Sequence, residues 1–129
     1  MRREGWLVLA AVALIVLAGG NQLYGFIIKP GVFGRLQPVM DTALDAVRRV
    51  WASHGLGAPV LTSIQDGKHM TGSLHADGLA FDVRLNDIPA TLHDTLRTEV
   101  QLLAGNAFDV LHEHHGTIED HLHTEFDPT

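Results

Sequence analysis

Two stretches of the chain repeat apolar residues at helical spacing. In residues 36–54 apolar side chains recur three or four positions apart, which is typical of an amphipathic helix. They are Val39, Met40, Ala43, Leu44, Val47, Val50 and Trp51. Residues 89–103 show the same spacing, and the side chains predicted to face inward are Leu92, Leu96, Val100 and Leu103. We therefore expect two helices, each packed by one face.

Elsewhere the apolar period changes to two, which indicates half-buried strands. In residues 79–85 large apolar side chains alternate with Ala80, Asp82 and Arg84, so Asp82 is predicted to point away from the core. Ala80 is small and shares that face, which leaves room beside the carboxylate.

Three more segments read as strands. Residues 121–126 place His121 and His123 on the same face, and short apolar runs predict strands at 60–63 and 108–111. Helices segregated from short strands predict an α+β fold. We expect a small antiparallel sheet with flanking helices.

The N-terminus follows neither period. Arg2 and Arg3 precede an uncharged apolar run at 6–20, which is typical of a targeting segment. Those fifteen residues span about 22 Å as a helix, less than the ~30 Å hydrocarbon core, so we extend the helix to Ile28. This predicts an uncleaved signal anchor at 1–29 that partners the inner membrane.

The rest of the chain, 30–129, is then a periplasmic or extracellular domain. Small residues at 18–20 also resemble a cleavage site, which leaves a cleaved signal peptide and secretion open.

Composition narrows the possible partners. The 129 residues suffice for one domain, and the formal net charge is −6. Nucleic-acid binding normally needs a basic face, so we expect no nucleic-acid partner. The chain has no cysteine, which excludes disulfides and acylation on cysteine.

Two segments supply ligands for one metal ion. A catalytic zinc site draws three ligands from His, Asp and Glu and leaves a fourth position open for water. His75, Asp82 and His123 meet this need, with Asp120 close by as a base, and Gly78 permits the turn from the His75 loop into the strand. The prediction is one zinc ion at the edge of the sheet.

These residues also carry a family resemblance. The chain reads Ser73-x-His75-x-x-Gly78-x-Ala80-x-Asp82 and later Asp120-x-x-His123. This combination resembles the zinc D-Ala-D-Ala carboxypeptidases and L-Ala-D-Glu endopeptidases of the hedgehog/DD-peptidase-like fold, and residues 66–75 resemble their small prophage-encoded and endolysin members. The resemblance covers about 60–129.

The resemblance implies a hydrolase that cuts peptidoglycan stem peptides in the cell wall. In such a metallopeptidase His75, Asp82 and His123 are the zinc ligands, and Asp120 is the catalytic acid/base. The two bond specificities, carboxypeptidase and endopeptidase, both stay open, as do phage lysis and host wall remodelling.

The base is the least constrained assignment. Asp120 has the wrong strand parity relative to His123 and needs a bulge or turn to reach the site. Glu113, Glu119 and Glu125 therefore stay open as alternative bases.

Neighbouring polar residues receive supporting roles. His121 is a second catalytic candidate that stabilises the tetrahedral intermediate or orients a ligand, and Ser73 is predicted to fix the loop that carries the first ligand. Lys68 and Arg84 are candidates to hold a substrate carboxylate, and each is equally a surface charge.

The remaining histidines have simpler interpretations. The run at 112–115 precedes Gly116 and predicts a solvated turn, with weak adventitious metal binding as the alternative. His54 is predicted to cap a helix C-terminus, and His69 to be a polar loop residue.

Two rival functions remain. One is a non-catalytic, zinc-containing module that binds the cell wall, and it is disfavoured by the retained Asp120. The other is a small lysis protein that acts through its N-terminal helix, and it leaves the metal ligands unexplained.

Overall fold

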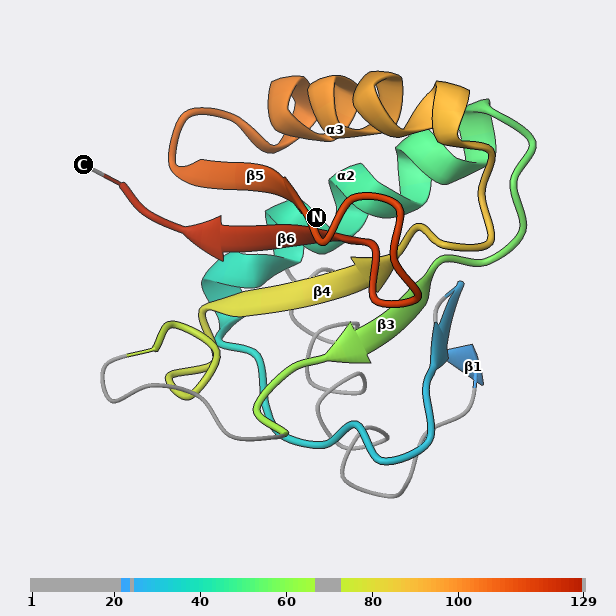
Figure 1. Ribbon diagram of the computed structural model, residues 1–129. Helices are drawn as coiled ribbons and strands as arrows, with labels where there is room; N and C mark the ends of the chain where they lie inside the picture. The colour runs from blue at the N-terminus through green and yellow to red at the C-terminus, as the bar shows by residue number, and fades with distance from the viewer. Residues whose placement is uncertain (1–21, 24, 67–72, 129) are drawn as a thin grey trace.

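Six strands form one mixed sheet, in the order β1-β2-β3-β4-β6-β5 (Figure 1). The computed structural model describes residues 22–23, 25–66 and 73–128. The strands are β1 (Gln22–Leu23), β2 (Phe26–Ile28), β3 (Val60–Ser63), β4 (Ala80–Arg84), β5 (Phe108–Glu113) and β6 (His121–Phe126). The helices are the 3-10 helix η1 (Pro38–Met40), α2 (Asp41–Ser53) and α3 (Ala90–Ala104).

The α+β class is confirmed, but the sheet is mixed where an antiparallel one was expected. β2 runs parallel to β3, and the other neighbouring strands are antiparallel. The reason is the connection: the chain crosses through η1 and α2 between these two strands, and a parallel pair requires such a crossover.

The pairing of β4 with β6 sorts their side chains between two faces. Asp82 lies opposite His123, and Val83 lies opposite Leu122. Val83 and Leu122 are fully buried on the face that α2 and α3 cover. Asp82 and His123 therefore lie on the other face, as their strand period predicted.

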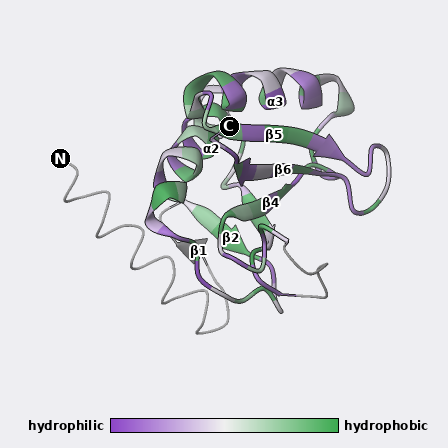
Figure 2. Cartoon of the chain, turned by 90° about the vertical axis from the view of Figure 1, so that its left-hand side faces the viewer, coloured by the Kyte–Doolittle hydropathy of each residue, from purple (hydrophilic) through white to green (hydrophobic). Residues whose placement is uncertain are grey.

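The two helices each bury one stripe, and in Figure 2 each carries hydrophobic and hydrophilic bands. The inner stripe of α2 contains Ala43, Leu44, Val47, Val50 and Trp51, as predicted. In α3 the buried residues are His93, Leu96, Val100 and Ala104.

Two residues expected in these stripes are instead exposed. Leu103 is 50% exposed because it lies about 100° around the helix from the buried Ala104. Val39 is 38% exposed because it belongs to η1, whose tighter turn differs from the expected α-helical spacing.

The predicted transmembrane helix and signal anchor running to Ile28 are wrong, and so is the membrane partner they implied. This segment forms β1 and β2, and Phe26 and Ile28 are each 2% exposed in the core, whereas Ile27 between them is 41% exposed. Among the described residues, none of the helices has the length and apolar character needed to cross a bilayer. The folded domain thus begins before Pro30, and the apolar run at 6–20 lies outside the described residues.

If β2 is part of the core, Phe26→Ala should lower the free energy of unfolding by about 3–5 kcal/mol. Chemical denaturation measures this change. Ile27→Ala is the matched control and should cost much less, because Ile27 is partly exposed on the same strand. Equal effects of the two substitutions would contradict the strand assignment.

Candidate metal centre

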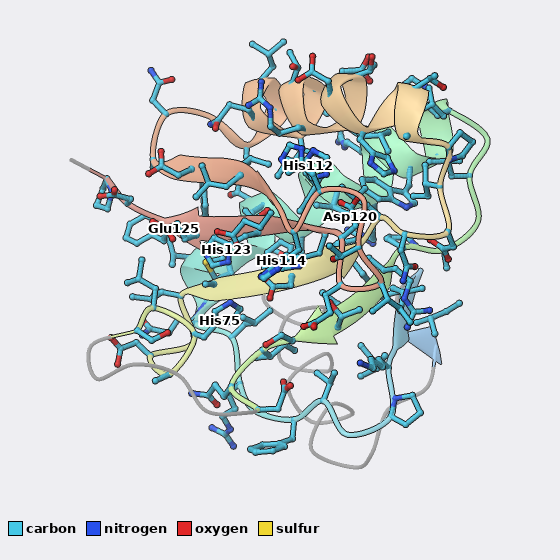
Figure 3. All side chains as sticks on the ribbon, viewed as in Figure 1. His75, His112, His114, Asp120, His123 and Glu125 are labelled. Carbon is cyan, nitrogen blue, oxygen red and sulfur yellow. The ribbon has the colours of Figure 1, made fainter. Side chains whose placement is uncertain are left out.

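Three side chains converge on the open face of the sheet. His75 comes from the loop before β4, Asp82 from β4 and His123 from β6, and Figure 3 shows the two imidazoles close together. Nε2 of His75 lies 3.2 Å from Nδ1 of His123 and 3.3 Å from Oδ1 of Asp82. The remaining distance, from Nδ1 of His123 to Oδ1 of Asp82, is 2.9 Å.

These distances match the spacing that a zinc ion requires. Zinc bonds of about 2.0–2.2 Å in tetrahedral geometry place ligand atoms about 3.3–3.6 Å apart. The three observed distances lie within a few tenths of an ångström of that range. Two imidazole nitrogens and one carboxylate oxygen are also donors that zinc accepts, so the residues fit the ion.

The loop that carries His75 is held by local contacts. The Oγ of Ser73 accepts the main-chain N–H of His75 at 3.2 Å, which is the role predicted for Ser73. Gly78 has φ 72°, and a Cβ there would collide with the main-chain oxygen of Arg35. Only glycine satisfies both conditions, so the turn into β4 depends on it.

Each histidine also has an outer hydrogen bond that orients its ring. Nδ1 of His75 donates to the main-chain oxygen of Ile64 at 2.8 Å. Nε2 of His123 lies 2.7 Å from Oε1 of Glu125 and donates to it. These outer bonds hold a proton on each outer nitrogen, so that the inner nitrogens, which face Asp82, would supply the lone pairs once a metal displaces any proton they carry, as is usual around metal-binding histidines.

Charge is strongly coupled within this group. Burial acts to raise the pKa of the Asp82 carboxyl, but hydrogen bonds from His123 and His75 hold that pKa well below its ordinary value. Burial acts to lower the pKa of His123, yet Asp82 and Glu125 together raise it to about 9. A metal ion must therefore displace a proton from His123 when it binds.

The group lies at the centre of the sheet, where the sequence had suggested the edge. β4 has β3 and β6 as neighbours, and β6 has β4 and β5. The strand period located Asp82 and His123 on a face, but the strand order, which depends on distant pairings, decided their central position.

The three ligands open onto a cleft of about 500 Å³. Its lining includes the predicted Arg84 and His121 together with Glu113, Glu119 and Lys29. Lys68 and His69 lie outside the described residues. The cleft thus combines the metal ligands with two cations and with carboxylates that can exchange protons.

Asp120 lines this cleft, but its carboxylate turns to the other face of the sheet. Oδ2 accepts the main-chain N–H of Gly116 at 2.8 Å, and Oδ1 lies 2.5 Å from Nε2 of His112. Burial acts to raise the pKa of the Asp120 carboxyl, but these two partners hold it below its ordinary value. Its side chain is therefore not brought to His75, Asp82 and His123, in keeping with its strand parity.

A different carboxylate stands beside the metal ligands. β5 pairs Glu113 with His121, and Oε1 of Glu113 lies 3.0 Å from Nε2 of His121. The same nitrogen is 3.6 Å from Oδ2 of Asp82. Sequence reasoning kept Glu113 only as an alternative, because cross-strand pairing is not visible in a local pattern.

The histidine run at 112–115 is only partly the predicted solvated turn. His112 and Glu113 belong to β5, whereas His114 and His115 are exposed and His114 has φ 56°. Strand β5 therefore extends two residues beyond the predicted end. His112 contacts Asp120, and His93 from α3 lies beside both, a grouping that no local pattern in the sequence indicates.

His54 takes the predicted place at the end of α2, where its main-chain N–H bonds the last turn. Its ring has a further partner, since Nε2 lies 2.9 Å from Oε1 of Glu99 on α3.

Comparison with protein-family models found no match to this chain, and comparison with curated proteins found none either. The family resemblance carried by residues 73–123 therefore stays a prediction.

Glu125 orients His123, so Glu125→Ala should weaken zinc binding at this centre by about 10- to 100-fold. Titration of the metal-free protein with zinc measures this affinity. The binding event that belongs to this centre is the one that His75→Ala abolishes. Glu119→Ala is the control, because Glu119 contacts Thr117 and His121 through its main-chain N–H and carbonyl groups, which the substitution keeps. An unchanged affinity in Glu125→Ala would show that this hydrogen bond does not orient the ligand.

Proposed function

We propose that this chain is a zinc-dependent peptidase that hydrolyses the stem peptides of peptidoglycan. The observation that carries the proposal is the triangle of ligand atoms from His75, Asp82 and His123, which has zinc-compatible spacing and opens onto a cleft. The motif that these residues share with cell-wall zinc peptidases supplies the substrate class.

His75, Asp82 and His123 would hold the ion. Zinc bound there would supply Lewis-acid polarisation of the scissile carbonyl and activation of a water molecule. The fixed outer hydrogen bonds to Ile64 and Glu125 keep both imidazoles oriented for this task.

Glu113 and His121 would handle the protons. The carboxylate of Glu113 is the proton acceptor of this pair. Because its side chain is 41% exposed, it can receive a proton from water in the cleft. Nδ1 of His121 donates to the main-chain oxygen of Glu119 at 2.6 Å, which leaves Nε2 to share a proton with Glu113 or with the substrate. We therefore assign the role of general base to Glu113 in place of Asp120, whose carboxylate faces the opposite side.

Cations in the cleft would bind the substrate. A stem peptide carries free carboxylates, and guanidinium groups bind carboxylates through paired hydrogen bonds. Arg84 lies opposite His121 on β4 and lines the cleft, as does Lys29. Peptidoglycan lies outside the cytoplasm, so the proposal includes export, for which the apolar run at 6–20 is a suitable signal.

The direct test is incubation of the full chain with purified peptidoglycan and mass analysis of released fragments. Loss of terminal D-alanine indicates carboxypeptidase action, and cleavage between L-alanine and D-glutamate indicates endopeptidase action. Binding to peptidoglycan without any fragment would support the non-catalytic module instead.

Glu113→Gln should lower the rate of hydrolysis by about 100- to 10,000-fold, because the amide keeps the shape but cannot accept a proton. Zinc content should remain that of the wild type. Glu119→Gln is the matched control on the same cleft and should retain nearly full activity. If Asp120→Asn is inactive and Glu113→Gln is not, the base is Asp120.

Arg84→Gln should raise KM about 10-fold or more while kcat changes little. The reason is that a contact with a substrate carboxylate that takes no part in the reaction stabilises the ground state and the transition state equally. Steady-state kinetics on a soluble stem peptide measures both constants. Arg97→Gln is the control, since Arg97 lies on α3 beside Asp94 and Thr98. A fall in kcat with unchanged KM would contradict a binding role.

A further inference from the structure

A second group of metal-binding side chains lies on the helix-covered face of the sheet. It consists of His93 from α3, His112 from β5 and Asp120, the residue before β6. One ligand atom from each lies within 4.8 Å of the others. The three side chains are 8%, 13% and 4% exposed. Figure 3 shows His112 on the α3 side, away from His75 and His123.

Hydrogen bonding leaves one nitrogen of His93 facing a carboxylate. Nε2 of His93 lies 2.8 Å from the main-chain oxygen of Ile88, and because a carbonyl only accepts, this nitrogen carries the proton. In the neutral ring Nδ1 then presents a lone pair to Oδ2 of Asp120, 3.6 Å away. Two buried acceptors that face each other repel, and either a proton on Nδ1 or a metal ion between the two atoms removes this repulsion.

The same arrangement occurs in the first centre. There His75 binds the main-chain oxygen of Ile64 and directs its other nitrogen to a carboxylate and a second imidazole. In the second group His93 binds the main-chain oxygen of Ile88 and directs Nδ1 to Asp120, with His112 beside it. A histidine fixed through a main-chain carbonyl is a common arrangement around metal ligands.

We propose that His93, His112 and Asp120 form a second binding site for a divalent transition metal of the zinc class. Two imidazoles and one carboxylate suit zinc, cobalt or nickel better than magnesium or calcium. The site is separate from the first, because its ligands lie on the opposite face of β6. It does not depend on the proposed peptidase activity.

The burial of this site gives it a stabilising role. Asp120 is covered on one side by the Gly116 turn, and the ring of His115 stacks on His112 at a centroid distance of 3.5 Å. Among these three residues only Asp120 lines the cleft, whereas all three candidate ligands of the first centre line it. An ion would instead link three consecutive elements, α3, β5 and the start of β6.

The test uses the full chain, freed of metal by a chelator and titrated with zinc alone by calorimetry. We expect two equivalents for the wild type and one for His75→Ala, in which the second group is untouched. His75→Ala combined with His112→Ala should bind none. His54→Ala is the matched control, because His54 also pairs with a carboxylate, Glu99, and should leave two equivalents.

A second measurement follows the thermal stability of the protein instead of the number of zinc ions bound. Zinc should raise the melting temperature of His75→Ala, a chelator should reverse the shift, and the shift should be absent when Asp120→Asn is added. If His75→Ala binds no zinc, and added zinc does not change the melting temperature of this variant, the second site is overturned. If the wild type binds one ion that His112→Ala loses and His75→Ala keeps, the second site holds and the proposed peptidase centre fails.

Discussion

The antiparallel pairing of β4 with β6 builds the hydrophobic core and the candidate metal centre with the same backbone hydrogen bonds. Val83 and Leu122 meet on the covered face, and Asp82 and His123 meet on the open face. A shift of one residue would exchange the two faces and would bury the charged pair against α2 and α3. The apolar side chains therefore enforce the register on which the metal ligands depend.

Strand alternation also explains how one short region of sequence serves both faces. His121 and His123 face the cleft, whereas the carboxylate of Asp120 reaches His112 and His93 under α3. Buried imidazoles and carboxylates are costly unless each finds a partner. Among the described residues, two of the three clusters of such side chains place histidine nitrogens against one carboxylate.

The segment before Pro30 forms strands where a helix was predicted, because a short apolar segment is compatible with both. Phe26 and Ile28 alternate with Ile27, but three residues following an apolar run do not distinguish a strand from the end of a helix. What decides between them is the parallel pairing with β3, in which Ile27 lies opposite Val60 and Ile28 opposite Leu61. The helix that would have extended to Ile28 is replaced by two strands that complete the sheet.

The sequence by itself determined the order of the main helices and strands, the α+β class, the turn from His75 into the strand of Asp82, and the polar strand faces that carry Asp82 and His123. Those features depend on alternation within one strand and on a local glycine turn, which nearby residues control. The tertiary structure decided the mixed sheet, the central position of the metal centre and the partners of Asp120 and Glu113. These depend on which strands pair, β2 with β3, β4 with β6 and β5 with β6, and on the packing of α3. Contacts between separate elements leave no periodic pattern in the sequence.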